Sequence, residues 1–208
     1  MQGIIFRPDV WKAQLRVLEE YGEAQTRRLS GLKEINQAPD RWILAPRDPL
    51  YSAYGWVFDS AERRCFIRPR YRVGEVLYIK EAWLTDKLYD YLKPSDIPQG
   101  GRTVGIWYWS GGNHYADKLA NAVGKARSSL FMPAWAARHF IKIKDVGAER
   151  LQEISDFDAI AEGITQFNDL EPPRRGFKEL WDILNPKYPW STNPWLWRYV
   201  FELTEAPK

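Results

Sequence analysis

Hydrophobic positions recur along the chain at two spacings, which separate the predicted helices from the predicted strands. Apolar residues three and four positions apart predict a helix that opens at Pro8 and stops at Gly22, with Trp11, Leu15 and Leu18 on one face. The same spacing predicts helices at 154–164 and 177–184. Ser155 and Asp158 have the spacing of a capping box at the start of the first of these two.

Runs rich in β-branched and aromatic residues predict the strands. They occupy 3–6, 41–44, 54–58, 76–84, 103–109, 138–146 and 196–204. Five to seven strands that do not alternate strictly with three or four helices disfavour a doubly wound parallel sheet. The expected fold is therefore α+β: a small, partly open β-barrel with helices packed at its ends.

The pattern is mixed between residues 85 and 130, where Pro94, Pro98 and glycine pairs interrupt it. A strand-like stretch at 103–109 and a helix-like one at 115–126 predict an inserted hairpin and short helix. The 208 residues are enough for one hydrophobic core. We therefore expect a single domain, 1–208, with an insertion at about 85–130.

Composition limits the chemistry of the chain. The formal charge of +3 gives no global attraction to nucleic acid, so any basic site must be local. A single cysteine, Cys65, excludes an internal disulfide and a multi-cysteine metal site, and neither His114 nor His139 has a neighbour at metal-ligand spacing. We expect no metal and no cofactor. No apolar run reaches the ~20 residues of a membrane span, so we expect a cytoplasmic protein without a membrane partner.

Aromatic residues are abundant, with eleven Trp, eleven Tyr and nine Phe. Such residues fill cores, and they also stack on nucleic acid bases. Core packing is the favoured interpretation, and it applies to 193–197. Trp107 and Trp109 fall on one face of a predicted strand, where they either cover the barrel or stack on bases.

The sequence lacks the common catalytic signatures, including G-x-S-x-G, the phosphate-binding G-x-x-x-x-G-K-S/T, H-E-x-x-H and G-x-G-x-x-G. Six other motifs occur in order. They are "AQTRRL" (24–29), "VGEVLYIKEAW" (73–83), "MPAWAARHFIKI" (132–143), "LQEISDFDAIAEGI" (151–164), "FKELWDIL" (177–184) and "NPWLWRYVFEL" (193–203). In this combination the chain resembles the ASCH-domain proteins of the PUA superfamily, particularly those of tailed phages and prophages.

This resemblance implies a PUA-like β-barrel with a cleft that binds RNA or modified bases, in a protein that works in the cytoplasm of a bacterial host. One relative of that family is an amidohydrolase that removes the acetyl group from N4-acetylcytidine, and another is associated with ribonuclease activity. By motif, the working threonine of the deacetylase falls on Thr26 and its glutamate on Glu162. Its lysine falls on Glu23, so the charge at that position is reversed.

The reversed charge leaves two ways to retain catalysis. Glu23 and Glu162 would repel each other, which would raise one pKa and leave a general acid or base. Alternatively, Lys80 would supply the missing cation. The simpler interpretations are that Thr26 hydrogen-bonds at the helix exit, and that Glu162, disfavoured at a helix C-terminus, pairs with an arginine.

Two groups of arginines are candidates for binding nucleic acid. Arg27 and Arg28 lie beside Thr26 and suit a phosphate, although both could be solvated charges. Arg68, Arg70 and Arg72 alternate with Pro69 and Tyr71, an interleaving that also occurs where single strands are held. Such a run is a solvated turn in most proteins.

Three functions follow from these observations. The first is binding of RNA or a modified nucleotide in a cleft near Thr26, Arg27, Lys80 and Glu162. The second is hydrolysis in the same cleft, without a metal, of an acylated cytidine-type base or an RNA phosphodiester. Glu162 would then be the general base. The third is a non-catalytic phage accessory protein that binds another protein through residues 85–128.

Overall fold

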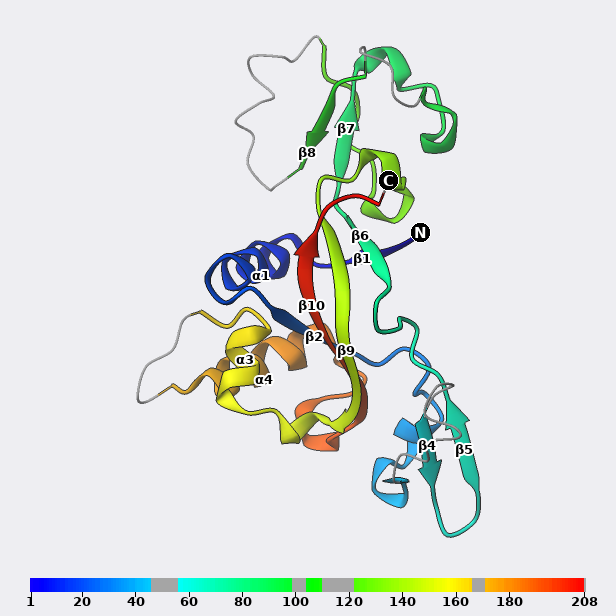
Figure 1. Cartoon of the computed structure of the whole chain (residues 1–208), viewed down its shortest axis with the longest axis vertical. Helices are drawn as coiled ribbons and strands as arrows, with labels where there is room; N and C mark the ends of the chain where they lie inside the picture. Colours follow the sequence, from blue (N-terminus) through cyan, green and yellow to red (C-terminus); the bar gives the residue numbers. More distant parts are fainter. Residues whose placement is uncertain (46–55, 99–103, 110–121, 166–170, 208) are drawn as a thin grey trace. The chain divides into compact units, whose positions relative to one another are not determined.

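The structure, a computed structural model, describes residues 1–45, 56–98, 104–109, 122–165 and 171–207 and shows an α+β chain (Figure 1). The chain packs as two compact units, each assembled from separate stretches. The first unit comprises Met1–Lys12, Val76–Ile141 and Leu203–Lys208. The second comprises Ala13–Glu75 and Lys142–Glu202.

The first unit contains two pairs of strands. β1 (Gln2–Ile5) runs parallel to β6 (Val76–Lys80), and β7 (Trp83–Thr85) runs antiparallel to β8 (Ile106–Tyr108). The β7–β8 pair and the turns around it enclose a core of their own. Its buried members are Trp83, Ile97, Met132 and Ala136.

The prediction of a single strand at 76–84 is wrong, because the backbone pairs with β1 up to Lys80 and with β8 from Trp83 onward. Ile79 donates its backbone N–H to His139 at 3.0 Å in β6, whereas Ala82 accepts from Trp109 at 2.8 Å on the β7–β8 side. The apolar and β-branched run continues across Glu81 and Ala82. Local propensity does not encode which strand is the partner, so the break is invisible in the sequence.

Of the hairpin expected within 85–130, the strand-like stretch at 103–109 contains β8, and its partner β7 lies at the end of the strand expected at 76–84. The helix expected at 115–126 falls mostly outside the described residues, and Val123 forms a β-bridge with Asp86 instead. The remaining regular structure of this unit is short 3-10 turns, at Lys87–Tyr89, Pro94–Asp96, Ser129–Phe131 and Ala134–Ala136.

Three strands form the centre of the second unit. In order these are β9 (Phe140–Arg150), β10 (Trp195–Thr204) and β2 (Ala24–Arg28), with β2 antiparallel to β10. α1 (Pro8–Tyr21) leads into β2 as predicted. The helix ends because Gly22 adopts a φ of 79°, a left-handed conformation that glycine reaches without strain.

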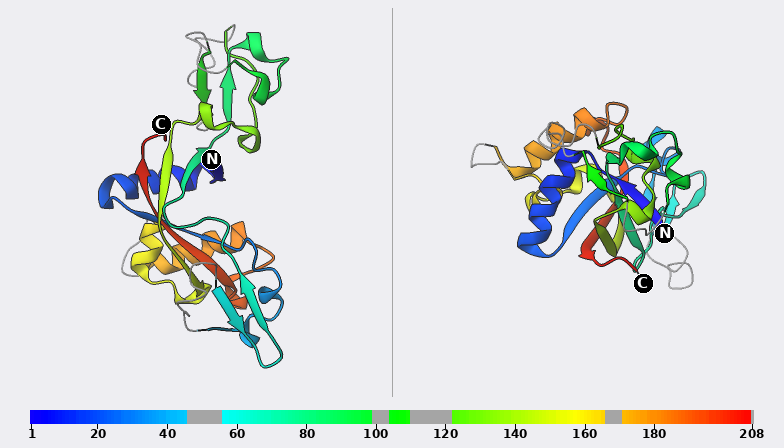
Figure 2. Two further views of the ribbon diagram at one scale, coloured as in Figure 1. Left: turned by 45° about the vertical axis from the view of Figure 1, so that its right-hand side comes forward. Right: turned by 90° about the horizontal axis from the view of Figure 1, so that it is seen from above.

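Side chains of β2 and β10 alternate between two faces, and the register places Gln25 opposite Val200 and Thr26 opposite Tyr199. We call the face that carries Gln25, Arg27, Arg198 and Val200 the helix face, because α3 packs on it (Figures 1 and 2). We call the opposite face the hairpin face, because the antiparallel strands within residues 43–67 pack on it. It carries Thr26, Arg28, Trp197 and Tyr199.

The helix face is covered by α3 (Asp156–Ala161) and α4 (Pro173–Leu184). Their apolar side chains form a core with the segment that follows β9 and with β10. Its buried members are Leu151, Ile154, Ala159, Phe177, Trp181 and Leu196. The capping box expected at the start of α3 is confirmed, since Ser155 Oγ accepts from the Asp158 backbone N–H and Asp158 reaches back to Ser155.

The hairpin face packs on aromatic rings. β4 (Trp56–Asp59) lies between β3 (Ile43–Leu44) and β5 (Arg64–Ile67) in an antiparallel sheet. The rings of Trp56 and Trp197 lie 5.2 Å apart, and those of Tyr71 and Tyr199 lie 5.4 Å apart. The expectation that 193–197 is core is confirmed, since Trp195, Leu196 and Trp197 are buried.

The remaining 3-10 turns of the second unit are Ile35–Gln37, Pro39–Arg41, Leu151–Glu153 and Trp190–Thr192. The α+β class is as expected. Among the described strands, none of the strand orders closes on itself to form a barrel. No helix in the described part of the chain is long and apolar enough to cross a membrane.

Candidate functional site

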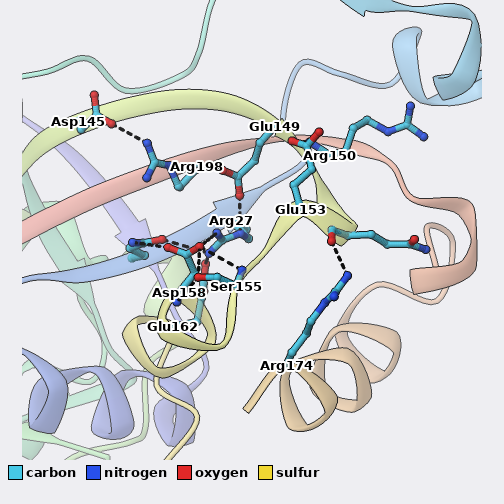
Figure 3. A network of polar contacts seen from close by, with 12 residues as sticks. Arg27, Asp145, Glu149, Arg150, Glu153, Ser155, Asp158, Glu162, Arg174 and Arg198 are labelled. Carbon is cyan, nitrogen blue, oxygen red and sulfur yellow. Dashed lines mark hydrogen bonds and ion pairs between the residues drawn. The ribbon is translucent and has the colours of Figure 1, made fainter. Parts of the chain in front are cut away.

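One arginine on the helix face of β2 is surrounded by three carboxylates from other parts of the second unit (Figure 3). Arg27 Nε donates to Glu149 Oε1 at 2.7 Å, and Nη1 donates to Glu162 Oε1 at 3.0 Å. Nη2 lies 3.7 Å from Asp158 Oδ2. The Arg27 side chain is only 1% exposed, so this is a buried charge network rather than a surface ion pair.

Each partner is held in place by local structure. Glu149 lies near the end of β9, and Glu162 is the C-cap residue of α3. Gln25 joins the network on the same face of β2, because its Nε2 donates to Asp158 Oδ1 at 2.9 Å and its Oε1 accepts from Arg27 at 3.2 Å. The guanidinium also lies 5.8 Å from the centre of the Phe177 ring.

Glu162 is the most perturbed acid of the network. Burial raises its pKa from 4.5 to about 7, although the charge and hydrogen bond of Arg27 act in the opposite direction. Burial also raises the pKa of Glu149, again against Arg27. In Asp158 burial raises the pKa, but the hydrogen bonds from Ser155 and Gln25 outweigh it, and the net pKa is lowered.

The directions of the pKa shifts give Asp158 and Glu162 different roles. Asp158 is ionised near neutral pH and balances Arg27, whereas Glu162 changes its protonation in the range where general acids and bases work. The simpler interpretation of Glu162 was that an arginine pairs with it at the helix C-terminus, and Arg27 is that partner. It accounts for the position of Glu162, and the raised pKa leaves that carboxyl able to exchange a proton.

Thr26 lies on the hairpin face, opposite Tyr199, and is 4% exposed. Glu162 contacts Arg27 on the other face of the same strand. Strand alternation therefore separates the two residues that the resemblance places in one site. Thr26 is also in the middle of β2, so it is not the helix-exit residue that the simpler interpretation expected.

Glu23 and Lys80 have other surroundings. The Glu23 side chain is 54% exposed, and its carboxylate lies 3.9 Å from Lys144 Nζ. Lys80 belongs to the first unit, where its Nζ donates to the Leu130 carbonyl at 2.7 Å and lies 5.6 Å from the centre of the Tyr78 ring. Glu81, the next residue, forms a two-point ion pair with Arg138.

Residues 68–72, the basic run, form a surface loop that one buried aromatic residue anchors. Tyr71 is buried against Tyr199, while Arg68, Arg70 and Arg72 are exposed. Arg70 lies over the Tyr71 ring at 5.4 Å. Arg68 lies at 5.7 Å over the ring of Phe66, which is itself exposed.

Arg28 joins this region from the hairpin face of β2. Burial lowers the pKa of its guanidinium, with Glu162, Tyr71 and Tyr199 acting in the opposite direction and Arg70 adding to the decrease. Arg27 and Arg28 therefore have different environments, as neighbours on a strand must. Arg27 pairs with the carboxylates of Glu149, Asp158 and Glu162, whereas Arg28 lies close to Arg70 and Tyr71.

Two participants were missed in the sequence. Glu149 was not singled out, and Asp158 was recognised only as a cap. No local pattern marks either residue, because both meet Arg27 from segments more than 120 positions away in the chain. In the described part of the chain, no group of three or more His, Cys, Asp or Glu side chains is placed to hold a metal ion.

In comparisons with known proteins, no family model, no curated protein and no solved structure matches the chain.

Proposed function

We propose that the second unit binds RNA or a modified nucleotide through the arginines of residues 68–72, in a phage-type ASCH protein with a partly open PUA-like barrel. One observation carries the proposal. The buried contact between Tyr71 and Tyr199 fixes a loop on which Arg68, Arg70 and Arg72 are all turned to solvent. Such a protein would act in the cytoplasm of a bacterial host.

The charge of this segment supports the proposal. Residues 60–75 contain five arginines and two glutamates, a local excess that the nearly neutral chain does not have as a whole. Guanidinium groups that lie over aromatic rings are already oriented, so less side-chain entropy is lost when they contact a phosphate. The exposed Phe66 ring offers a surface on which a base can stack.

The test is RNA binding measured as a function of salt concentration. Each phosphate contact contributes about 0.7 to the slope of log K against log salt for a single strand. The triple variant Arg68→Glu, Arg70→Glu, Arg72→Glu is expected to lower the slope by about 2 for single-stranded RNA. The matched control changes three exposed cations elsewhere in the second unit, Arg16, Lys178 and Lys187, to Glu.

The control is expected to lower affinity only slightly and to keep the slope. RNA binding that is absent in the wild type, or an equal decrease of the slope in both triple variants, would show that this loop is not the binding surface. Circular dichroism of each variant checks that the fold is retained. Modified nucleosides are titrated in parallel to find the preferred base.

A second candidate function, a metal-independent hydrolase, is favoured by the raised pKa of Glu162. A carboxyl with a pKa of about 7 can take a proton from water and later return it to a leaving group. Water would attack the acyl carbon of an acylated cytidine-type base, and Glu162 would accept its proton. The proton would then pass to the departing base nitrogen.

Comparison of the wild type with Glu162→Gln separates the two candidates. A hydrolase turns over substrate as the wild type, and the variant loses this turnover but retains RNA or nucleoside binding. A binding protein shows no turnover in either form and retains binding in both. The assay is incubation of wild type and variant with RNA and a panel of modified nucleosides, read by mass spectrometry. No product from the wild type excludes the hydrolase for every substrate in the panel.

A further inference from the structure

A small hollow lies on the helix face of the second unit, next to the Arg27 network. Its volume is about 240 Å³, and α1 and α3 form its walls. α1 contributes Val17 and Tyr21, which are four residues apart and so share a face of that helix. α3 contributes Phe157 and Ile160, which are three residues apart and also share a face of their helix.

The floor comes from the two central strands. Val200 and Gln25 lie opposite each other in the register of β10 and β2, and both line the hollow. The Gln25 side chain is buried and held by Asp158 and Arg27, so the floor is rigid. The interior is therefore mostly aliphatic, with one fixed amide.

The rim is aromatic and acidic. Tyr21 is 54% exposed and Phe157 is 70% exposed, which is unusual for large apolar side chains beside a hollow. Glu23 lines the same opening. A carboxylate beside exposed aromatic rings is a combination that attracts organic cations, through the charge and through the negative faces of the rings.

The segment of α1 that leads to the rim is acidic. Residues 13–23 contain three glutamates, Glu19, Glu20 and Glu23, and one cation, Arg16. The last turn of α1 has no basic residue, so these carboxylates lie near the negative end of the helix dipole without a compensating charge on that turn. Lys144 lies closer to Glu202, at 2.9 Å, than to Glu23, at 3.9 Å.

We propose that this hollow is a binding site for a small organic cation with an apolar body, of the alkylammonium class. The alkyl chain would lie on Val17, Ile160 and Val200, and the ammonium group would lie at the rim between Glu23 and the rings of Tyr21 and Phe157. The hollow is smaller than the about 300–1,000 Å³ typical of drug-sized ligands, so the ligand is small. The acidic rim repels phosphate, and a nucleotide is therefore not the occupant.

This site is separate from the proposed RNA surface. The hollow opens on the helix face of β2 and β10, whereas Tyr71 and the arginine loop pack on the hairpin face. The two proposals consequently have independent tests, and either can fail while the other stands.

The experiment titrates the full chain with three probes that share one alkyl chain, namely pentylamine, pentanol and pentanoate, by isothermal calorimetry or by NMR chemical shifts. A partly exposed carboxylate and the faces of two rings together give pentylamine an expected preference of about tenfold over pentanol. Pentanoate is expected to bind more weakly than pentanol. Equal affinity for amine and alcohol, stronger binding of pentanoate, or no binding of any probe would overturn the proposal.

Two variants test the residues that carry the argument. Glu23→Gln is expected to reduce the preference for the amine over the alcohol to about threefold, and Glu179→Gln, an exposed carboxylate on α4, is the matched control that leaves it unchanged. Val200→Phe fills the hollow and is expected to abolish binding of the amine and the alcohol while RNA binding is unchanged. If Val200→Phe binds pentylamine as the wild type does, the ligand lies elsewhere and the proposal is wrong.

Discussion

The protonation of Glu162 has a measurable consequence for stability. In the unfolded chain this carboxyl has a pKa near 4.5, and burial in the folded protein raises it to about 7. Between these values the folded state holds a proton that the unfolded state has released. The free energy of unfolding contributed by Glu162 is therefore fully present below pH 4.5 and decreases as the pH rises to 7.

The magnitude follows from the two pKa values. At about 1.4 kcal/mol for each pKa unit, the difference between 4.5 and about 7 corresponds to about 3 kcal/mol. Glutamine has the shape of a protonated glutamate and cannot ionise. We therefore expect Glu162→Gln to be more stable than the wild type by about 1 kcal/mol at pH 5 and by about 3 kcal/mol at pH 8.

The assay is urea unfolding followed by tryptophan fluorescence at several pH values between 5 and 8, for the wild type, Glu162→Gln and Glu179→Gln. Burial also raises the pKa of Glu149 and lowers that of His139. Both groups are present in all three proteins, so the difference between Glu162→Gln and the wild type reports on Glu162 together with its electrostatic coupling to Glu149. Glu179→Gln, at an exposed position on α4, controls for the removal of a carboxylate as such.

One result would refute the reasoning. If Glu162→Gln is less stable than the wild type by the same amount at pH 5 and pH 8, Glu162 is ionised throughout and its ion pair with Arg27 outweighs the effect of burial. The raised pKa would then be absent, and with it the argument for a general base.

Further substitutions test how the network and its supports are held. Arg27→Met leaves Glu149 and Glu162 buried without their cation, and it is expected to lower the free energy of unfolding by about 3–5 kcal/mol at pH 8. The decrease is expected to be smaller at pH 5, because the two acids take up protons. Urea unfolding at both pH values measures it. Ser155→Ala removes the N-cap of α3 and is expected to cost about 1 kcal/mol in the same assay. Gly163→Ala, at a φ of 100° and with the new Cβ only 3.1 Å from Ala13 Cβ, is expected to lower stability by about 1–3 kcal/mol.

The protein-interaction function expected for residues 85–128 stays a prediction, and exposed apolar side chains of that segment are where it can be tested. Leu88 and Tyr91 are 69% and 81% exposed. A double Leu88→Ser, Tyr91→Ser variant is expected to leave stability and RNA binding unchanged, because neither side chain is part of a core. The same assays check it, and a large decrease in either would show that these residues act within the chain.

The elements that could be predicted are those whose own residues carry the pattern. α1 and α3 follow from apolar spacing and their start and stop residues, α4 follows from apolar spacing except for its first turn at Pro173, and β10 follows from the alternation of its side chains. β2 was not predicted as a strand, because five residues that include three charged or amide side chains and a threonine have no apolar period of their own. They form a strand because β10 lies beside them.

The candidate site divides in the same way. The sequence by itself determined that a short helix ends before Gly163 with Glu162 in its last turn, since this depends on local spacing, whereas Thr26 and Glu162 were singled out as site residues by the family resemblance. Tertiary structure alone decided that Glu149 and Asp158 converge on Arg27, that Thr26 turns to the other face, and that burial moves the pKa of Glu162 to about 7. The physical reason is that strand pairing and burial act between residues more than a hundred positions apart, where no local pattern in the sequence records them.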